Sequence, residues 1–193
     1  MKATKLLMIL LVLCFVSSAV YSQGLGLSVF AGYAMSAFED QDDAAGTIPV
    51  GVRVSKQMAP KIDVGAEFLY PIGGFKFEVQ ESYWGQTYSY DLTINQMLIG
   101  AFAKMILSEG GMSPYAKAGV GMYMGNAKAE GDGIDEDVDI DSAIGFNVGA
   151  GINLSSKPMY IEFNYHIVSR KTEGADEATG ANFWNIILGY NIK

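Results

Sequence analysis

A strictly alternating segment, GFNVGAGINL over Gly145–Leu154, constrains the fold of this chain more than any other feature. Every second residue in it is apolar, and the residues between are only glycine and asparagine. Alternation with a period of two is typical of a β-strand with one apolar face. A soluble sheet would carry long polar and charged side chains on its other face. Whether the apolar face points inward or outward therefore decides the class of protein.

Seven further segments alternate, six of them regularly. The regular ones are Leu25–Ser36, Ile48–Lys56, Ile62–Tyr70, Ala116–Met124, Ile161–Ile167 and Trp184–Ile192. In the remaining segment, Tyr88–Leu107, the phase of the alternation is indistinct after Gln96. A β-bulge at Asn95–Gln96 would reset the register there. The sequence therefore predicts eight strands.

The connections between these segments also alternate, in length. The long ones are Ala37–Thr47, Pro71–Thr87, Gly125–Asp141 and Ser169–Asn182, and the short ones are Gln57–Lys61, Ser108–Ser113 and Ser155–Pro158. Short periplasmic turns and longer extracellular loops are typical of barrels in an outer membrane. We therefore predict an all-β fold, an eight-stranded antiparallel up-and-down transmembrane β-barrel whose apolar faces point to lipid.

Five charged residues within the regular strands lie on the face opposite the apolar one, together with the glycines: Arg53, Asp63, Glu67, Lys117 and Glu162. An eight-stranded barrel has a lumen only wide enough for side chains to fill. A buried charge in such a lumen requires a partner of opposite sign. We predict a structural polar network in the lumen, formed by Arg53, Asp63, Glu67, Lys117, Glu162 and His166.

The first 22 residues have the features of a cleaved signal peptide. Lys2 and Lys5 are followed by the apolar run Leu6–Val16 and by small residues before Gln23. This run is shorter than the roughly 20 apolar residues of a membrane-spanning helix. We expect residues 1–22 to be removed and residues 23–193 to form the outer-membrane barrel domain.

The predicted mature chain contains no cysteine, because Cys14 is the only one in the sequence. Disulfide scaffolds and thiolate metal sites are thereby excluded. Removing two lysines with the signal peptide leaves 11 basic and 21 acidic residues, a net charge of −10. Nucleic acid is not an expected partner, because its binding depends on Lys and Arg that neutralise phosphates.

Several segments resemble strands of a known family. GFNVGAGINL, PYAKAGVGMY, VGAEFLYP, IEFNYHIV and NFWNIILGYNIK are similar to strands of the small eight-stranded OmpA/OmpX-like outer-membrane β-barrel proteins. The resemblance covers Gly24–Lys193. It implies an outer-membrane location in a Gram-negative bacterium, a monomer, and contacts with outer-membrane lipid, lipopolysaccharide and the assembly machinery.

Three features outside this pattern were considered as sites. His166, the only histidine, lies four residues after Glu162, which at ~3.3 Å per residue is too far for a hydrogen bond within one strand. The acidic segment Glu130–Asp141 does not match a calcium-loop spacing and is expected to be a solvated loop. The segment after PIGG alternates again and predicts a protruding hairpin, with Phe75, Phe77, Tyr83 and Trp84 as candidate extracellular contacts. The alternative for this hairpin is that it covers the mouth of the barrel.

The function that these features favour is non-enzymatic. We expect a structural or surface-interaction role through the long extracellular loops, with no cofactor or metal and with a surface ligand, host cell or neighbouring cell as partner. One alternative is a narrow, low-conductance, porin-like channel. Another is a secreted, lipocalin-like barrel that binds an apolar ligand in its lumen. The least favoured alternative, a lipid A-modifying enzyme, depends on His166 alone.

Overall fold

The computed structural model describes residues 24–38, 45–83, 86–131, 134–154, 157–171 and 178–192. These residues form one antiparallel sheet of nine strands. The strands are β1 (Gly26–Phe38), β2 (Gly46–Ala59), β3 (Ile62–Ile72), β4 (Phe75–Tyr83), β5 (Gln86–Ile106), β6 (Met112–Gly131), β7 (Ile134–Leu154), β8 (Met159–Lys171) and β9 (Ala178–Ile192). No helix within the described ranges is long and apolar enough to cross a membrane. The predicted signal peptide lies outside the described residues and stays a prediction.

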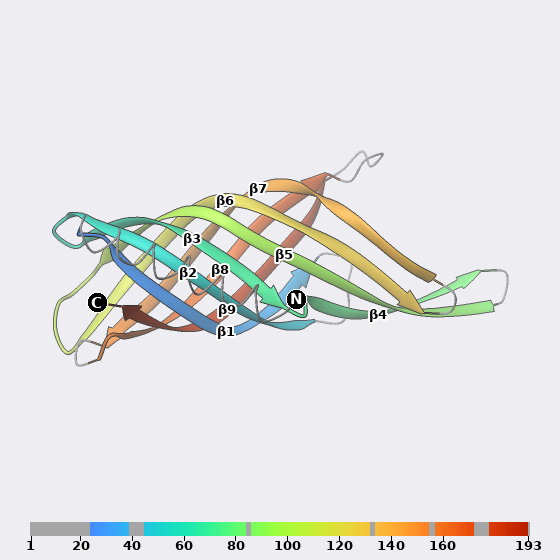
Figure 1. Cartoon of the computed structure of the whole chain (residues 1–193), viewed down its shortest axis with the longest axis horizontal. Coiled ribbons are helices and arrows are strands. Elements are labelled where there is room, and N and C mark those ends of the chain that lie inside the picture. The colour runs from blue at the N-terminus through green and yellow to red at the C-terminus, as the bar shows by residue number, and fades with distance from the viewer. Residues whose placement is uncertain are drawn as a thin grey trace, which may run out of the picture.

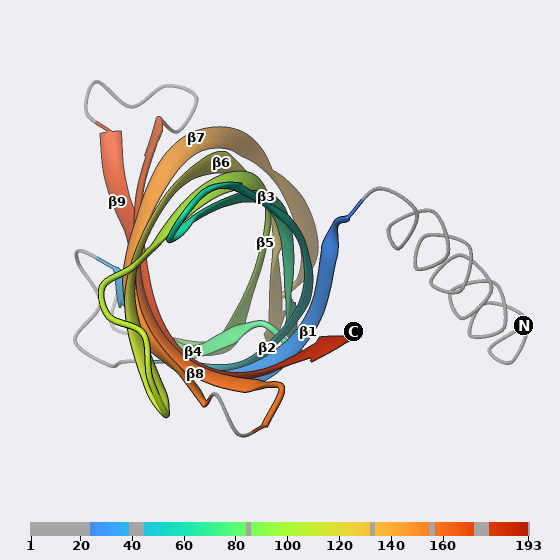
Figure 2. The same cartoon turned by 90° about the vertical axis from the view of Figure 1, so that its left-hand side faces the viewer.

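Eight of the strands close into a ring, which Figure 2 shows end-on. Neighbours pair in sequence from β3 through β2, β1, β9, β8, β7 and β6 to β5, and β5 then pairs back with β3. A closed ring satisfies the backbone hydrogen-bonding groups that lipid cannot. The predicted eight-stranded up-and-down barrel is confirmed. The ninth strand, β4, pairs with β5 beyond the ring and forms the predicted hairpin.

The apolar faces of the strands point outward. In the segment Gly145–Leu154, Phe146 and Val148 are 59% and 50% exposed, whereas Asn147 between them is 1% exposed. The same contrast holds on β9, where Ile186 and Leu188 are exposed on either side of the buried Ile187. An outward apolar belt suits lipid, and it leaves glycine, asparagine and charges to line the lumen. Such a lumen does not suit the apolar ligand of a lipocalin-like barrel.

The inward glycines provide space for aromatic rings of the neighbouring strands. Tyr160 is the cross-strand partner of Gly189, and a Cβ at Gly189 would lie 2.0 Å from the tyrosine ring. Phe30 over Gly51 follows the same rule, with a Cβ distance of 2.3 Å. Glycine within a strand often marks such a close approach. The glycines of the inner face are therefore part of the packing of a narrow lumen.

The predicted bulge at Asn95–Gln96 is wrong. β5 pairs with β6 in one continuous register from Asp91 to Ile106, and its even-numbered residues face inward throughout. The apolar residues change phase along the sequence because β5 passes from lipid into water. Within the membrane the outward residues, such as Ile99, are apolar, whereas above it the inward residue Ile94 packs against the buried core. A bulge does occur nearby, where β7 has two residues opposite Met124 of β6.

The acidic segment Glu130–Asp141 is not a loop, contrary to expectation. β6 continues to Gly131 and β7 begins at Ile134, so most of the segment is paired strand. Acidic residues alternate there with Val138 and Ile140, a strand pattern that the charges obscure. Figure 1 shows β4–β7 continuing past the ends of the other strands. We call this extension, which comprises β4, residues 86–97 of β5, residues 124–131 of β6 and residues 134–142 of β7, the projecting sheet.

Candidate functional site

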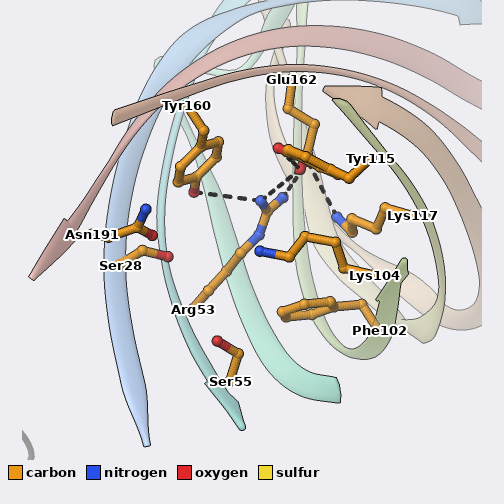
Figure 3. Close-up of a pocket in the computed structure, with 10 residues that line it drawn as sticks. All are labelled: Ser28, Arg53, Ser55, Phe102, Lys104, Tyr115, Lys117, Tyr160, Glu162 and Asn191. Carbon is orange, nitrogen blue, oxygen red and sulfur yellow. Dashed lines mark hydrogen bonds and ion pairs between the residues drawn. The ribbon is translucent and has the colours of Figure 1, made fainter. Parts of the chain in front are cut away.

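A cluster of four charged side chains occupies the lumen, and Figure 3 shows three of them, Arg53, Lys117 and Glu162. Arg53 of β2 contacts Glu67 of β3 through Nε at 2.9 Å and Glu162 of β8 through Nη2 at 2.6 Å. Lys117 of β6 contacts the same two carboxylates with Nζ, at 2.7 Å and 3.5 Å. Each cation therefore touches both anions, and the four charges sum to zero.

The four side chains are almost completely withdrawn from solvent, with exposures of 7% or less. Burying charges is favourable only if the remaining polar atoms are also satisfied. Tyr115 donates a hydrogen bond to Glu162 at 2.7 Å, and Asn147 donates one to Glu67 at 3.3 Å. The Arg53 guanidinium lies 4.8 Å from the centroid of the Phe30 ring, a cation–π contact. The charged groups of the cluster thus have ion-pair and hydrogen-bond partners inside the lumen, as expected for a structural element.

His166 is joined to this cluster through two asparagines. The Lys117 amine lies 3.4 Å from Asn164, whose amide donates to Asn185 at 2.9 Å. The Asn185 amide in turn donates to Nε2 of His166 at 3.0 Å, so that Nδ1 carries the proton and donates to the Tyr123 hydroxyl at 2.9 Å. The imidazole also stacks on Phe183 at 4.1 Å between ring centroids. These contacts hold both ring nitrogens in structural bonds.

The structure brings together most of the residues predicted for the lumen, but not all. Arg53, Glu67, Lys117 and Glu162 form the cluster, and His166 joins it indirectly. Asp63 lies apart and pairs with Lys104 at 3.0 Å, where the two side chains are 18% and 20% exposed. Six further lumen residues were not predicted: Lys104, Tyr115, Tyr160, Asn147, Asn164 and Asn185. All but Lys104 stand on the polar phase of regular strands or directly before one.

The end of the barrel with the long connections is closed by a buried apolar layer that we call the cap: Phe75, Phe77, Leu98, Tyr123 and Phe183, each 3% exposed or less. The prediction that Phe75 and Phe77 are extracellular contacts is wrong, because β4 folds over the mouth and turns these rings inward. The Phe75 ring lies 5.7 Å from Phe183 of β9. The Tyr83 side chain and Trp84 lie outside the described residues.

Two cavities lie in the lumen among the described residues. The one beside the charge cluster has a volume of about 20 Å³, which is room for about one water molecule. The other, about 560 Å³, is an open vestibule at the end with the short turns, lined by Asp63, Lys104 and the ends of the described chain. Within the described ranges, no three His, Cys, Asp or Glu side chains are arranged to hold a metal ion. Cluster and cap therefore close the lumen at two levels.

The outer surface of the projecting sheet is strongly acidic. Glu78, Asp91, Glu130 and Asp135 are successive cross-strand partners and form one row across four strands. Like charges placed directly opposite repel one another. Lys76 and Lys128 lie next to this row on the same face, and a hydrogen bond to Glu130 raises the pKa of the Lys128 amine. All four carboxylates of the row are exposed, so this face presents a negative field to the medium.

A family model described as "Outer membrane protein beta-barrel domain" matches residues 6–191. Among solved structures, Ail, the attachment invasion locus protein of Yersinia pestis, is 19% identical, with a TM-score of 0.54 and coverage of 86% of this chain and 99% of Ail. Neisserial surface protein A is 12% identical, with a TM-score of 0.53 over 88% of this chain and 97% of its own. No curated protein matches the sequence.

Proposed function

The chain belongs to the outer membrane protein β-barrel domain family, and we propose that it acts there as a non-enzymatic surface protein whose projecting sheet contacts partners outside the cell. Its location in the outer membrane and its barrel fold follow from family and structure together. The surface role is the proposal, and the two alternatives in the membrane are a narrow channel and an enzyme.

The observation that carries the proposal is the contrast between a closed lumen and extended strands. β5 and β7 have 21 residues each and β6 has 20, whereas a strand needs about 9–11 residues to span a bilayer. Roughly half of each strand therefore lies beyond the membrane, in an ordered sheet rather than a mobile loop. Phe75 and Phe77 of this extension pack in the cap, whereas residues 135–139 of β7 are exposed, and an ordered strand that is exposed supports a role in contact.

The closed lumen disfavours conduction. A hydrated path would have to pass four charged side chains that contact one another and then the apolar cap. The buried state of His166, which is 1% exposed, likewise disfavours catalysis on lipid A, because the lipid lies on the opposite side of the strand. A secreted barrel for apolar ligands is excluded by the outward apolar face and by the outer-membrane location.

The structure of Ail in complex with the heparin analogue sucrose octasulfate indicates that a barrel of this fold can bind a ligand. The present chain has an acidic projecting sheet, and a polysulfated ligand would be repelled by it. We therefore expect its partners to differ in charge from sucrose octasulfate.

The test compares bacteria that display the full chain with bacteria that display a variant shortened by removal of residues 126–139, at equal amounts of folded protein. We expect the full chain to increase cell–cell sedimentation or attachment to epithelial monolayers, and the shortened variant to lose this effect. Equal behaviour of the two strains would contradict the proposal. Reproducible current steps from the refolded protein in a planar bilayer would favour the channel instead.

A further inference from the structure

One edge of the projecting sheet has no partner strand among the described residues. β7 pairs with β6 from Ile134 onward, but its pairing with β8 begins only at Gly145. Beyond Val168, β8 continues by pairing with β9 alone. Within the described ranges, residues Ile134–Ile140 of β7, above the bulge, therefore have a neighbouring strand on one side only, and we call them the β7 edge. An edge strand carries backbone N–H and C=O groups that can pair with another chain.

From Asp135 to Asp139 the side chains of the β7 edge are exposed and predominantly acidic. Asp135, Asp137 and Asp139 are the partners of Glu130, Lys128 and Asn126 on β6 and share the outer face of the sheet. Glu136 and Val138 lie on the other face, where Val138 is 56% exposed. One face of the β7 edge therefore carries only carboxylates, and the other carries a carboxylate and an apolar side chain.

The surroundings compensate little of this charge. Lys128 is the cation on the paired stretch of β6, and it already contacts Glu130 as well as Asp135, the latter at 3.8 Å. Asn126 donates a hydrogen bond to Asp137 at 2.7 Å but carries no charge. The opposite edge of the sheet, on β4, differs because its outer face has both Lys76 and Glu78. Strong negative charge and a free strand edge therefore coincide at β7.

We propose that the β7 edge binds an extended cationic polypeptide segment by strand addition. In a strand added beside β7, the residues opposite Asp135, Asp137 and Asp139 would approach them to about 4.5–5.5 Å between Cβ atoms. Lysine or arginine at every second position fits these places, and apolar residues between them fit Val138. Backbone pairing supplies affinity, and the alternate side chains supply specificity. This inference rests on the proposed surface role and names its partner class.

The test uses labelled peptides and the full chain refolded in detergent, with binding followed by fluorescence anisotropy. The first probe alternates lysine and valine over the length of Ile134–Ile140. A second peptide has the same composition with all lysines at one end, and a third is methylated at every backbone nitrogen. We expect the alternating peptide to bind most tightly and the methylated one not to bind. Equal binding of all three would mean simple charge attraction and would overturn strand addition.

The first protein variant neutralises the edge, with Asp135→Asn, Asp137→Asn and Asp139→Asn combined. We expect it to weaken binding of the alternating peptide about tenfold, since three opposed charge pairs are lost. A heat-shifted gel band confirms that the barrel is folded.

The matched control removes the same charge elsewhere on the same face, with Glu78→Gln, Asp91→Asn and Glu130→Gln combined. We expect this variant to weaken binding less than about threefold, because only general attraction changes. The inference would be overturned if both variants lost the same affinity for the alternating peptide. It would also be overturned if no peptide bound, or if the chain bound sucrose octasulfate instead. If one of these results occurs but removal of residues 126–139 still abolishes cell attachment, the surface role stands and only the cationic partner is rejected.

Discussion

Neutralising Glu162 should destabilise the barrel more than neutralising Asp63 at the vestibule. Arg53 and Lys117 each contact both Glu162 and Glu67 inside the lumen. In the Glu162→Gln variant, two buried cations would share one carboxylate, which leaves an uncompensated positive charge. Breaking a buried ion pair by removing one partner costs about 3–5 kcal/mol. We expect a loss of that size in the free energy of unfolding.

Two further variants make this prediction specific. Asp63→Asn removes one carboxylate from the Asp63–Lys104 pair, which is partly exposed at the vestibule. Pairs open to water contribute about 1 kcal/mol or less, so this loss should be small. Adding Lys117→Met to Glu162→Gln restores a neutral cluster and should recover most of the stability, because well-packed apolar groups can replace a buried pair.

The assay is urea unfolding of protein reconstituted in lipid vesicles, followed by tryptophan fluorescence and by the heat-shifted gel band. Midpoint and slope together yield the free energy of unfolding. Equal losses for Glu162→Gln and Asp63→Asn would mean that water reaches the cluster, and the closed-lumen reasoning would be refuted. A double variant that is less stable than Glu162→Gln alone would refute charge balance as the cause.

Three other predictions use the same unfolding assay or a planar bilayer. Gly189→Val should lower the free energy of unfolding by about 1–3 kcal/mol, because the valine side chain would overlap the Tyr160 ring. Adding Tyr160→Ala should relieve part of that loss, and strictly additive losses would exclude this contact as the cause. Val148→Arg, in the outward belt, should lower the free energy of unfolding by about 2–4 kcal/mol. Val138→Arg, on the projecting sheet, should lower it by less than about 0.5 kcal/mol. Similar losses for the two variants would contradict the assigned position of the membrane. The refolded protein should give no discrete current steps, and regular steps would show that cluster and cap open.

The projecting sheet shows why the strand prediction was right in kind but wrong in extent. Alternation within β5 shows only which residues share a face. The even-numbered residues face inward along the whole strand. The apolar face, however, changes sides where the strand leaves the lipid, so Ile94 packs inward although Ile99 faces outward. A pattern read as a bulge was therefore a change of solvent. For the same reason Phe75 and Phe77, apolar residues outside the membrane, are buried in the cap and not exposed.

The sequence by itself determined the inside and the outside of this protein. Strict alternation assigns each residue to one of two faces, and the absence of long polar side chains opposite Val148 identifies the apolar face as the lipid face. This information is local and survives in any register. Connection lengths likewise determined which end of the barrel carries the extensions.

Only the tertiary structure decided which lumen residues meet. Arg53 and Glu162 are 109 positions apart, and their contact depends on how far each strand is shifted along its neighbours as the ring closes. That stagger brings Glu162 to Arg53 and Lys117 but leaves Asp63 at the vestibule with Lys104. The same closure ends the pairing of β8 with β7 at Gly145, so that the β7 edge has no second neighbouring strand in the part of the chain that the structure describes. Alternation within one strand is insensitive to such shifts, because it records a face and not a height in the barrel.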